Sequence, residues 1–149
     1  MKWTYIICGV VCLCALLTVA TLRNMTSSAS QYVEIARHTV AVEIADDEAE
    51  RAQGLSGRKS LDEGSGLLFI FPSEARYGFW MKDMRFAIDI VWISKEQAVA
   101  HIVENVTPET YPSVFEPSQP ALYALEVPAG WVASHNIQLG DPVALRFAF

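Results

Sequence analysis

Cysteine is missing from all but the first part of the chain. The three cysteines, Cys8, Cys12 and Cys14, all lie within one apolar N-terminal stretch. The remaining residues therefore have neither disulfide nor thiolate chemistry. A domain the size of residues 32–149 can fold without such cross-links, so this absence does not identify a redox compartment.

Positive charge is also scarce. After Lys2 the chain holds 10 Lys and Arg residues against 17 Asp and Glu residues, a net charge of −7. The densest basic cluster is the pair Arg58-Lys59. Because nucleic-acid binding needs a basic stripe that neutralises phosphates, we expect no nucleic-acid partner.

Motifs for metals, cofactors and nucleophiles are missing as well. The histidines His38, His101 and His135 are far apart, and no HxH, HExxH or CxxC pair is present. The run 54–57 lacks one residue of the G-x-S-x-G elbow, and there is no phosphate-binding glycine loop. We expect no metal and no cofactor, and the absence of a complete catalytic set argues against an enzyme without deciding the question.

The first 23 residues are predicted to be a membrane anchor or a signal peptide. Residues 3–22 carry no charge, and a helix of that length spans about 30 Å, the thickness of a hydrocarbon core. The small residues Thr18 and Ala20 form a weak cleavage site, so both interpretations stay open. Residues 24–31 are a polar linker, and residues 32–149 form one domain. We expect that domain to lie outside the cytoplasm, tethered to the inner membrane or released into the periplasm.

Short apolar runs predict a mostly β domain. They are too closely spaced for repeated βαβ crossovers, which favours an antiparallel sheet curled into a barrel-like or sandwich domain with two short helices. Asp46-Asp47 is expected to cap the first helix, which ends near Gly54, and Pro128 to start the second. The predicted strands are 32–35, 40–44, 67–71 (stopped by Pro72), 88–93, 98–106, 122–127 and 143–149, with another extended piece at 78–81.

Two carboxylates interrupt apolar strands. Asp89 falls on the face of Val91 and Ile93, and Glu126 falls on the face of Ala124. An ionised carboxylate buried without a partner is costly, so each should meet a cation or backbone donors. One interpretation is a structural buried pair, and the other is a polar site at the mouth of the barrel.

Trp80 and Lys82 share one face of an extended segment, opposite Phe79 and Met81. An aromatic ring beside a cation on an exposed edge suits stacking on a sugar or another flat ligand. The alternative is a core tryptophan with Lys82 reaching out to solvent.

These residues also carry a family likeness, in the runs 50–58, 66–71, 79–82, 88–90, 125–130 and 140–141. In order and spacing the chain resembles the bacterial and archaeal family catalogued as Domain of Unknown Function 192. The resemblance implies a compact β-rich fold, often behind an export signal, and no established activity. It departs where Asp83-Met84 replaces the usual Asn-Thr pair and where Ser56 replaces a common methionine. The matching motif residues are Arg51, Gly54, Leu55, Arg58, Trp80, Met81, Lys82, Asp89, Glu126, Gly130, Gly140 and Asp141.

Three functions fit these features. The first is a non-enzymatic, membrane-tethered binding or accessory module of the cell envelope, taking a saccharide or another small ligand. The second is a hydrolase or transferase acting on an envelope saccharide, with Asp89 and Glu126 as acid and base. The third is a protein–protein adaptor that uses the proline-rich loop 107–120. The candidate binding residues are Arg58, Trp80, Lys82, Asp89 and Glu126.

Overall fold

The computed structural model describes residues 31–146. The predicted leader, linker residues 24–30 and the end of the last predicted strand, 147–149, lie outside the described residues. Within the described part, no helix is both long and apolar enough to cross a membrane.

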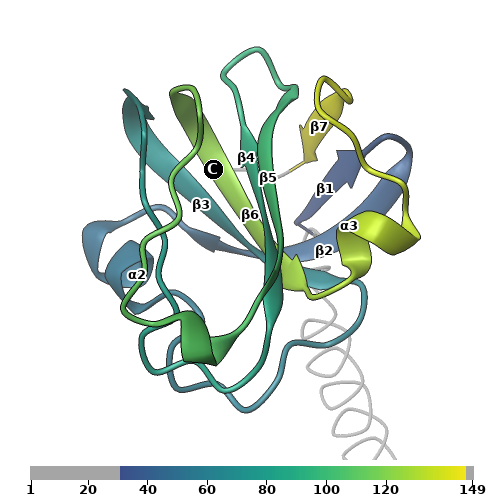
Figure 1. The fold of residues 1–149 in the computed structure, drawn as a ribbon. Coiled ribbons are helices and arrows are strands. Elements are labelled where there is room, and N and C mark those ends of the chain that lie inside the picture. The colour runs from purple at the N-terminus through teal and green to yellow at the C-terminus, as the bar shows by residue number, and fades with distance from the viewer. Residues whose placement is uncertain (1–30, 147–149) are drawn as a thin grey trace, which may run out of the picture. The chain divides into compact units, whose positions relative to one another are not determined.

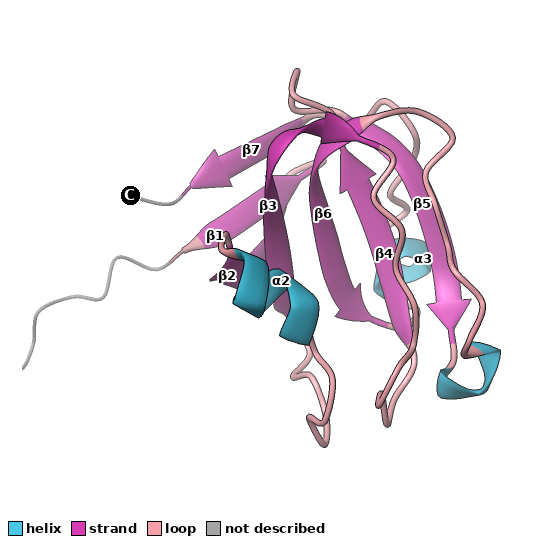
Figure 2. Cartoon of the chain, turned by 90° about the vertical axis from the view of Figure 1, so that its left-hand side faces the viewer, coloured by secondary structure: helices cyan, strands magenta, loops and turns pink. Residues whose placement is uncertain are grey.

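Seven strands form one sheet in the order β5-β4-β6-β3-β2-β1-β7. Figures 1 and 2 show the sheet strongly curled, as a half-barrel, with α2 and α3 on opposite sides of it. The mostly β prediction is therefore confirmed. The strands are β1 (Tyr32–Ile35), β2 (His38–Ala45), β3 (Ser65–Ala75), β4 (Ile88–Ile93), β5 (Val99–Val106), β6 (Ala121–Pro128) and β7 (Val143–Arg146).

All strand pairs are antiparallel except β2 with β3, which are parallel. A parallel pair needs a crossover connection, and here it contains the helix α2 (Glu48–Gln53). Asp47 caps this helix in a capping box. Its side chain accepts a hydrogen bond from the Glu50 backbone N–H, and the Glu50 side chain accepts one from the Asp47 backbone N–H. The second helix, α3 (Trp131–Ser134), begins later than predicted because Pro128 still belongs to β6. A short 3-10 helix, η1 (Pro108–Thr110), lies in the loop after β5.

The prediction that Pro72 stops its strand is wrong, since β3 continues to Ala75. The pairing with β6 shifts between Ile70 and Ala75, so Pro72 falls in an irregular stretch of the ladder. A proline is tolerated there because its missing N–H has no partner to lose.

The sheet carries an apolar cluster on each face. The first cluster includes Val91, Leu125 and Val127, and α3 packs against it through Trp131 and Val132. The second cluster includes Phe69, Phe79, Ile90 and Ala124. Residues that alternate along one strand therefore enter different clusters, and this decides which polar side chains can meet.

Candidate binding site

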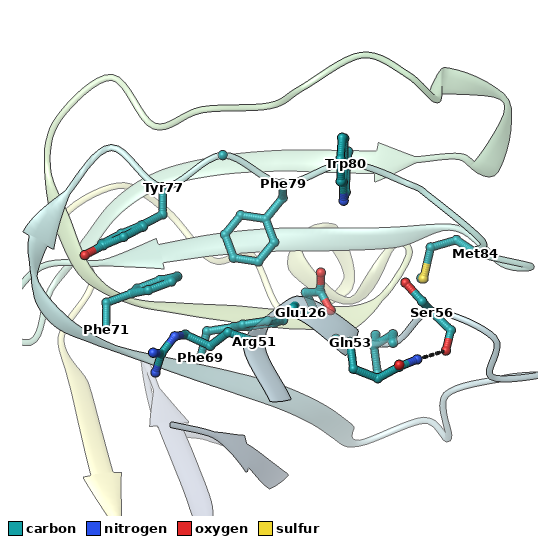
Figure 3. Close-up of a pocket in the computed structure, with 14 residues that line it drawn as sticks. Arg51, Gln53, Ser56, Phe69, Phe71, Tyr77, Phe79, Trp80, Met84 and Glu126 are labelled. Carbon is teal, nitrogen blue, oxygen red and sulfur yellow. Dashed lines mark hydrogen bonds between the residues drawn. The ribbon is translucent and has the colours of Figure 1, made fainter. Parts of the chain in front are cut away.

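A pocket of about 120 Å³ lies on the side of the sheet that carries the second apolar cluster. Its walls come from α2 and the turn after it, from β3, from residues 77–84 and from β6. Figure 3 shows these side chains around the opening. The fourteen lining residues are Arg51, Ala52, Gln53, Gly54, Leu55, Ser56, Phe69, Phe71, Tyr77, Gly78, Phe79, Trp80, Met84 and Glu126.

Glu126 is the acidic group of this pocket. Its residue is only 6% exposed, and its Oε2 atom is buried without a hydrogen-bond partner in the described part of the chain. Burial raises the pKa of Glu126 from 4.5 to about 8, an effect that the charge of Arg58 partly offsets. At neutral pH the side chain is therefore mostly a protonated, uncharged carboxylic acid.

Arg58 forms no hydrogen bond with Glu126 but makes a bidentate ion pair with Glu43. Its Nη1 and Nη2 atoms lie 2.5 and 2.9 Å from the two carboxylate oxygens of Glu43. This pairing raises the pKa of Arg58 and lowers that of Glu43. Because the Arg58 charge is shared with Glu43, it compensates the burial of Glu126 only partly.

Aromatic rings form most of the apolar wall. Phe69 and Phe79 meet edge to face at 4.9 Å between ring centres, and Phe71 stacks on Tyr77 at 3.6 Å. Trp80 is 54% exposed and stands at the edge of the pocket. Because the three phenylalanines are buried against one another and against Tyr77, the exposed Trp80 ring offers most of the flat, apolar surface to a ligand.

The expected alternation of residues 79–82 is present. Phe79 and Met81 are buried, while Trp80 and Lys82 are exposed. The Lys82 Nζ atom lies 5.9 Å from the centre of the Trp80 ring, within the range of a cation–π contact. Lys82 also lines a shallow depression beside the pocket, formed by residues 52, 53, 56, 57 and 82–85.

Asp89 lies on the opposite face of the sheet. In the antiparallel register, Asp89 faces Val127 and Ile90 faces Glu126, so the two carboxyl groups point in opposite directions. Asp89 is fully buried, and its oxygens accept the backbone N–H groups of Asn105 and Val132 at 2.8 and 2.9 Å. The hypothesis that Asp89 and Glu126 act together as acid and base is therefore wrong, because the two cannot reach one substrate.

Of the five predicted site residues, Trp80 and Glu126 line the pocket, and Lys82 lines the adjoining depression. Arg58 acts on Glu126 through its charge, and Asp89 is excluded from the site. Sequence reasoning did not connect Arg51, Gln53, Phe69 or Phe71 with this site. The spacing of Phe69 and Phe71, two residues apart on one strand face, was the available signal.

The wall formed by α2 is tied to its neighbours. The Arg51 Nη1 atom donates to the backbone oxygens of Asp46 and Ile70, the latter at 2.9 Å, which ties α2 to β3. Gln53 donates to the Ser56 carbonyl at 2.8 Å, and the Ser56 hydroxyl donates to the Lys82 carbonyl at 2.9 Å. These bonds hold α2 and residues 80–84 around one opening. Among residues 31–146, no group of three His, Cys, Asp or Glu side chains could hold a metal ion.

Fold and site together define a half-barrel β domain with a small aromatic pocket closed at its base by a buried carboxylic acid. Residues 31–145 match the family DUF192, described as "Uncharacterized ACR, COG1430". The chain belongs to this family.

Two crystal structures are similar over most of their length. One, from Sinorhizobium meliloti 1021 and described as "a putative transcription regulator", is 29% identical with a TM-score of 0.73; the match covers 78% of this chain and 94% of that one. A protein of unknown function from Novosphingobium aromaticivorans DSM 12444 is 27% identical with a TM-score of 0.73, covering 80% and 89%. A comparison with curated proteins gave no match.

Proposed function

We propose that this protein is a non-enzymatic binding module of the cell envelope that takes a small ligand into the pocket above Glu126. The observation that carries the proposal is the unpartnered Oε2 atom of Glu126, buried among aromatic rings. A buried polar group without a partner is costly, and natural proteins retain few of them. A ligand that supplies the missing hydrogen bond would remove this cost.

The pocket suits binding better than acid–base catalysis. Asp89 is on the other face of the sheet, so Glu126 lacks the second carboxyl group that a glycosidase mechanism uses. The pocket, at about 120 Å³, is slightly smaller than the cavity of about 150 Å³ that holds benzene, so it takes at most one small ring, with the rest of the ligand at its mouth.

We also propose that the domain lies outside the cytoplasm. The uncharged stretch 3–22 would place the domain outside the cytoplasm, either tethered or released. Alkaline phosphatase fused after Phe149 should be active if the domain is exported, since that enzyme needs an oxidising compartment for its disulfides. An inactive fusion that is stably produced would contradict export. The net charge of −6 disfavours nucleic-acid binding, so we do not extend a role in transcription from the Sinorhizobium relative to this chain.

The binding function is tested by thermal unfolding of the full-length chain in lipid nanodiscs with a library of small envelope metabolites and sugars. A ligand specific for the folded state raises the melting temperature by mass action. The effect should shrink in Trp80→Ala and remain in Tyr32→Phe, a matched aromatic change outside the pocket. If no compound stabilises the chain, or if Trp80→Ala leaves every stabilisation intact, the pocket does not bind small molecules.

A second candidate function is the adaptor that uses loop 107–120. It is favoured by two exposed apolar side chains in that loop, Val114 and Tyr111, the second of which contacts the Trp80 ring. Replacing both by serine should abolish crosslinking to the partner in intact cells while leaving small-ligand binding unchanged. Crosslinking that survives the double substitution would contradict this function.

A further inference from the structure

The charge around the pocket differs from that of the whole domain. When Glu126 is protonated, Arg51 is the only charged residue among the fourteen that line the pocket. The adjoining depression shares Ala52, Gln53, Ser56 and Met84 with the pocket and adds Gly57, Lys82, Asp83 and Arg85. We call Arg51, Lys82 and Arg85 the basic rim, since their three positive charges outnumber the single negative charge of Asp83. A net positive rim on an acidic domain favours a ligand with a negative group.

The basic rim can bind an anion without breaking hydrogen bonds or ion pairs that stabilise the fold. Arg51 uses a single nitrogen, Nη1, for both of its backbone bonds, which leaves the rest of its guanidinium group for a ligand. Lys82 and Arg85 form no ion pair within residues 31–146. Arg58, in contrast, is engaged by Glu43 and lines neither the pocket nor the depression.

At the base of the pocket, the surroundings of Glu126 favour an uncharged group of the ligand. The cross-strand neighbours of Glu126 are the apolar residues Leu67 on β3 and Ile90 on β4. The other ionisable side chains that line the pocket are Arg51 and Tyr77, and the charge of Arg58 acts on Glu126 from outside the lining. A protonated carboxyl group in such surroundings donates a hydrogen bond to an oxygen of the ligand.

Resting on the proposed function, we infer that the ligand is a small organic acid. Its flat body lies between the aromatic walls, an uncharged oxygen at one end accepts a hydrogen bond from Glu126, and its anionic group at the other end meets the basic rim. Hydroxyaryl carboxylates have this arrangement and a ring of the size that the pocket admits.

Three compounds that share one ring test the charge. They are 4-hydroxybenzoate, 4-hydroxybenzyl alcohol and protonated 4-hydroxybenzylamine, titrated calorimetrically into the full-length chain in nanodiscs at pH 7. The acid should bind about tenfold more tightly than the alcohol, a difference of about 1.4 kcal/mol, and the amine should bind most weakly. If the alcohol or the amine binds as tightly as the acid, the pocket binds ligands but the inference of an acid is wrong.

Variants of the rim test where the acid group lies. Lys82→Gln combined with Arg85→Gln should bring the affinity for 4-hydroxybenzoate down to that for the alcohol and leave the alcohol unaffected. Lys59→Gln, an exposed lysine that lines neither the pocket nor the depression, is the matched control and should change nothing. An equal loss for acid and alcohol would show a structural effect and overturn the assignment of the rim.

Glu126 provides a separate readout. Above pH 8 the affinity for the acid should fall by up to about tenfold per pH unit, because the complex retains a proton that the free protein loses. Glu126→Gln keeps a donor and should bind the acid at pH 7 with an affinity nearly independent of pH up to 9. A pH dependence equal in both proteins would contradict the role of Glu126. If none of the three compounds binds while the library screen finds another ligand, the acid class is wrong and the binding function stands.

Discussion

At the scale of single residues, the buried carboxyl group of Glu126 makes the stability of the domain depend on pH. Its pKa is about 8 in the folded protein against an ordinary 4.5. Below pH 4.5 the group is protonated in both states and adds no pH dependence to the free energy of unfolding. As the pH rises toward 8, only the unfolded chain releases the proton, so the free energy of unfolding should fall by up to about 1.4 kcal/mol per pH unit.

Urea unfolding between pH 5 and 8 measures this slope. Glu126→Gln should remove most of it and make the protein more stable than the parent at pH 8, because the amide does not ionise. Glu104→Gln, an exposed glutamate on β5, should leave the slope unchanged. Identical slopes in the parent and in Glu126→Gln would show that Glu126 ionises normally in the folded state.

Asp89, in contrast to Glu126, is a buried carboxyl group whose oxygens are hydrogen-bonded, and its role is structural. Its two oxygens hold the N–H groups of Asn105, at an irregularity of the β4–β5 pairing, and of Val132 in α3. Asp89→Asn turns one acceptor into a donor facing an N–H group and should cost about 2–4 kcal/mol of unfolding free energy. Ligand affinity at a temperature where the variant is folded should equal that of the parent, and a selective loss of affinity would place Asp89 in the site after all.

At the scale of elements, α2 is a short helix that contributes Arg51, Ala52 and Gln53 to the pocket wall. Asp47→Ala removes its capping box and should lower stability by about 1 kcal/mol and weaken ligand binding through the loosened wall. Asp46→Ala is the matched control, because Asp46 contributes its backbone oxygen to Arg51. Equal effects of the two substitutions on urea unfolding would contradict the importance of the cap.

Elements also show what the sequence could predict. Local patterns identified every strand of the sheet and the capped start of α2, because alternation and capping act over a few residues. The faces of Asp89 within β4 and of Glu126 within β6 followed from the same alternation. Whether those faces coincide depends on the register between β4 and β6, with Asp89 opposite Val127. Register is a long-range property, so the sequence left the shared acid–base site open.

The pocket was hidden for a similar reason. Its wall joins α2, β3, residues 77–84 and β6, which are distant in the sequence. Trp80 was singled out because it shares one face of an extended segment with Lys82, and Glu126 because it is an acid in an apolar strand. Arg51 and Gln53 carry no such signal, since polar residues are ordinary on a short helix, and only the sheet pairing brings them to Glu126.

At the scale of the whole molecule, the half-barrel provides two faces with separate tasks. One face holds α3 and the hydrogen-bonded Asp89, which fix the fold, and the other holds the pocket under α2 and residues 77–84. An acidic domain with a locally basic rim attracts an anion only at short range, because salt screens charges beyond about 10 Å. Affinity for 4-hydroxybenzoate should therefore decline only modestly between 50 and 300 mM salt, and a steep decline would place the anion on the open surface.

The most direct measurement is the titration of the Glu126 carboxyl group by ¹³C NMR, assigned with Glu126→Gln, in the absence and presence of 4-hydroxybenzoate. The free protein should show a pKa near 8. The bound protein should show a higher pKa, because a ligand oxygen that accepts a hydrogen bond from the protonated carboxyl group stabilises the protonated form. A pKa near 4.5 that 4-hydroxybenzoate leaves unchanged would contradict two claims. Glu126 would then be ionised at neutral pH, and the ligand would not bind in the pocket above it.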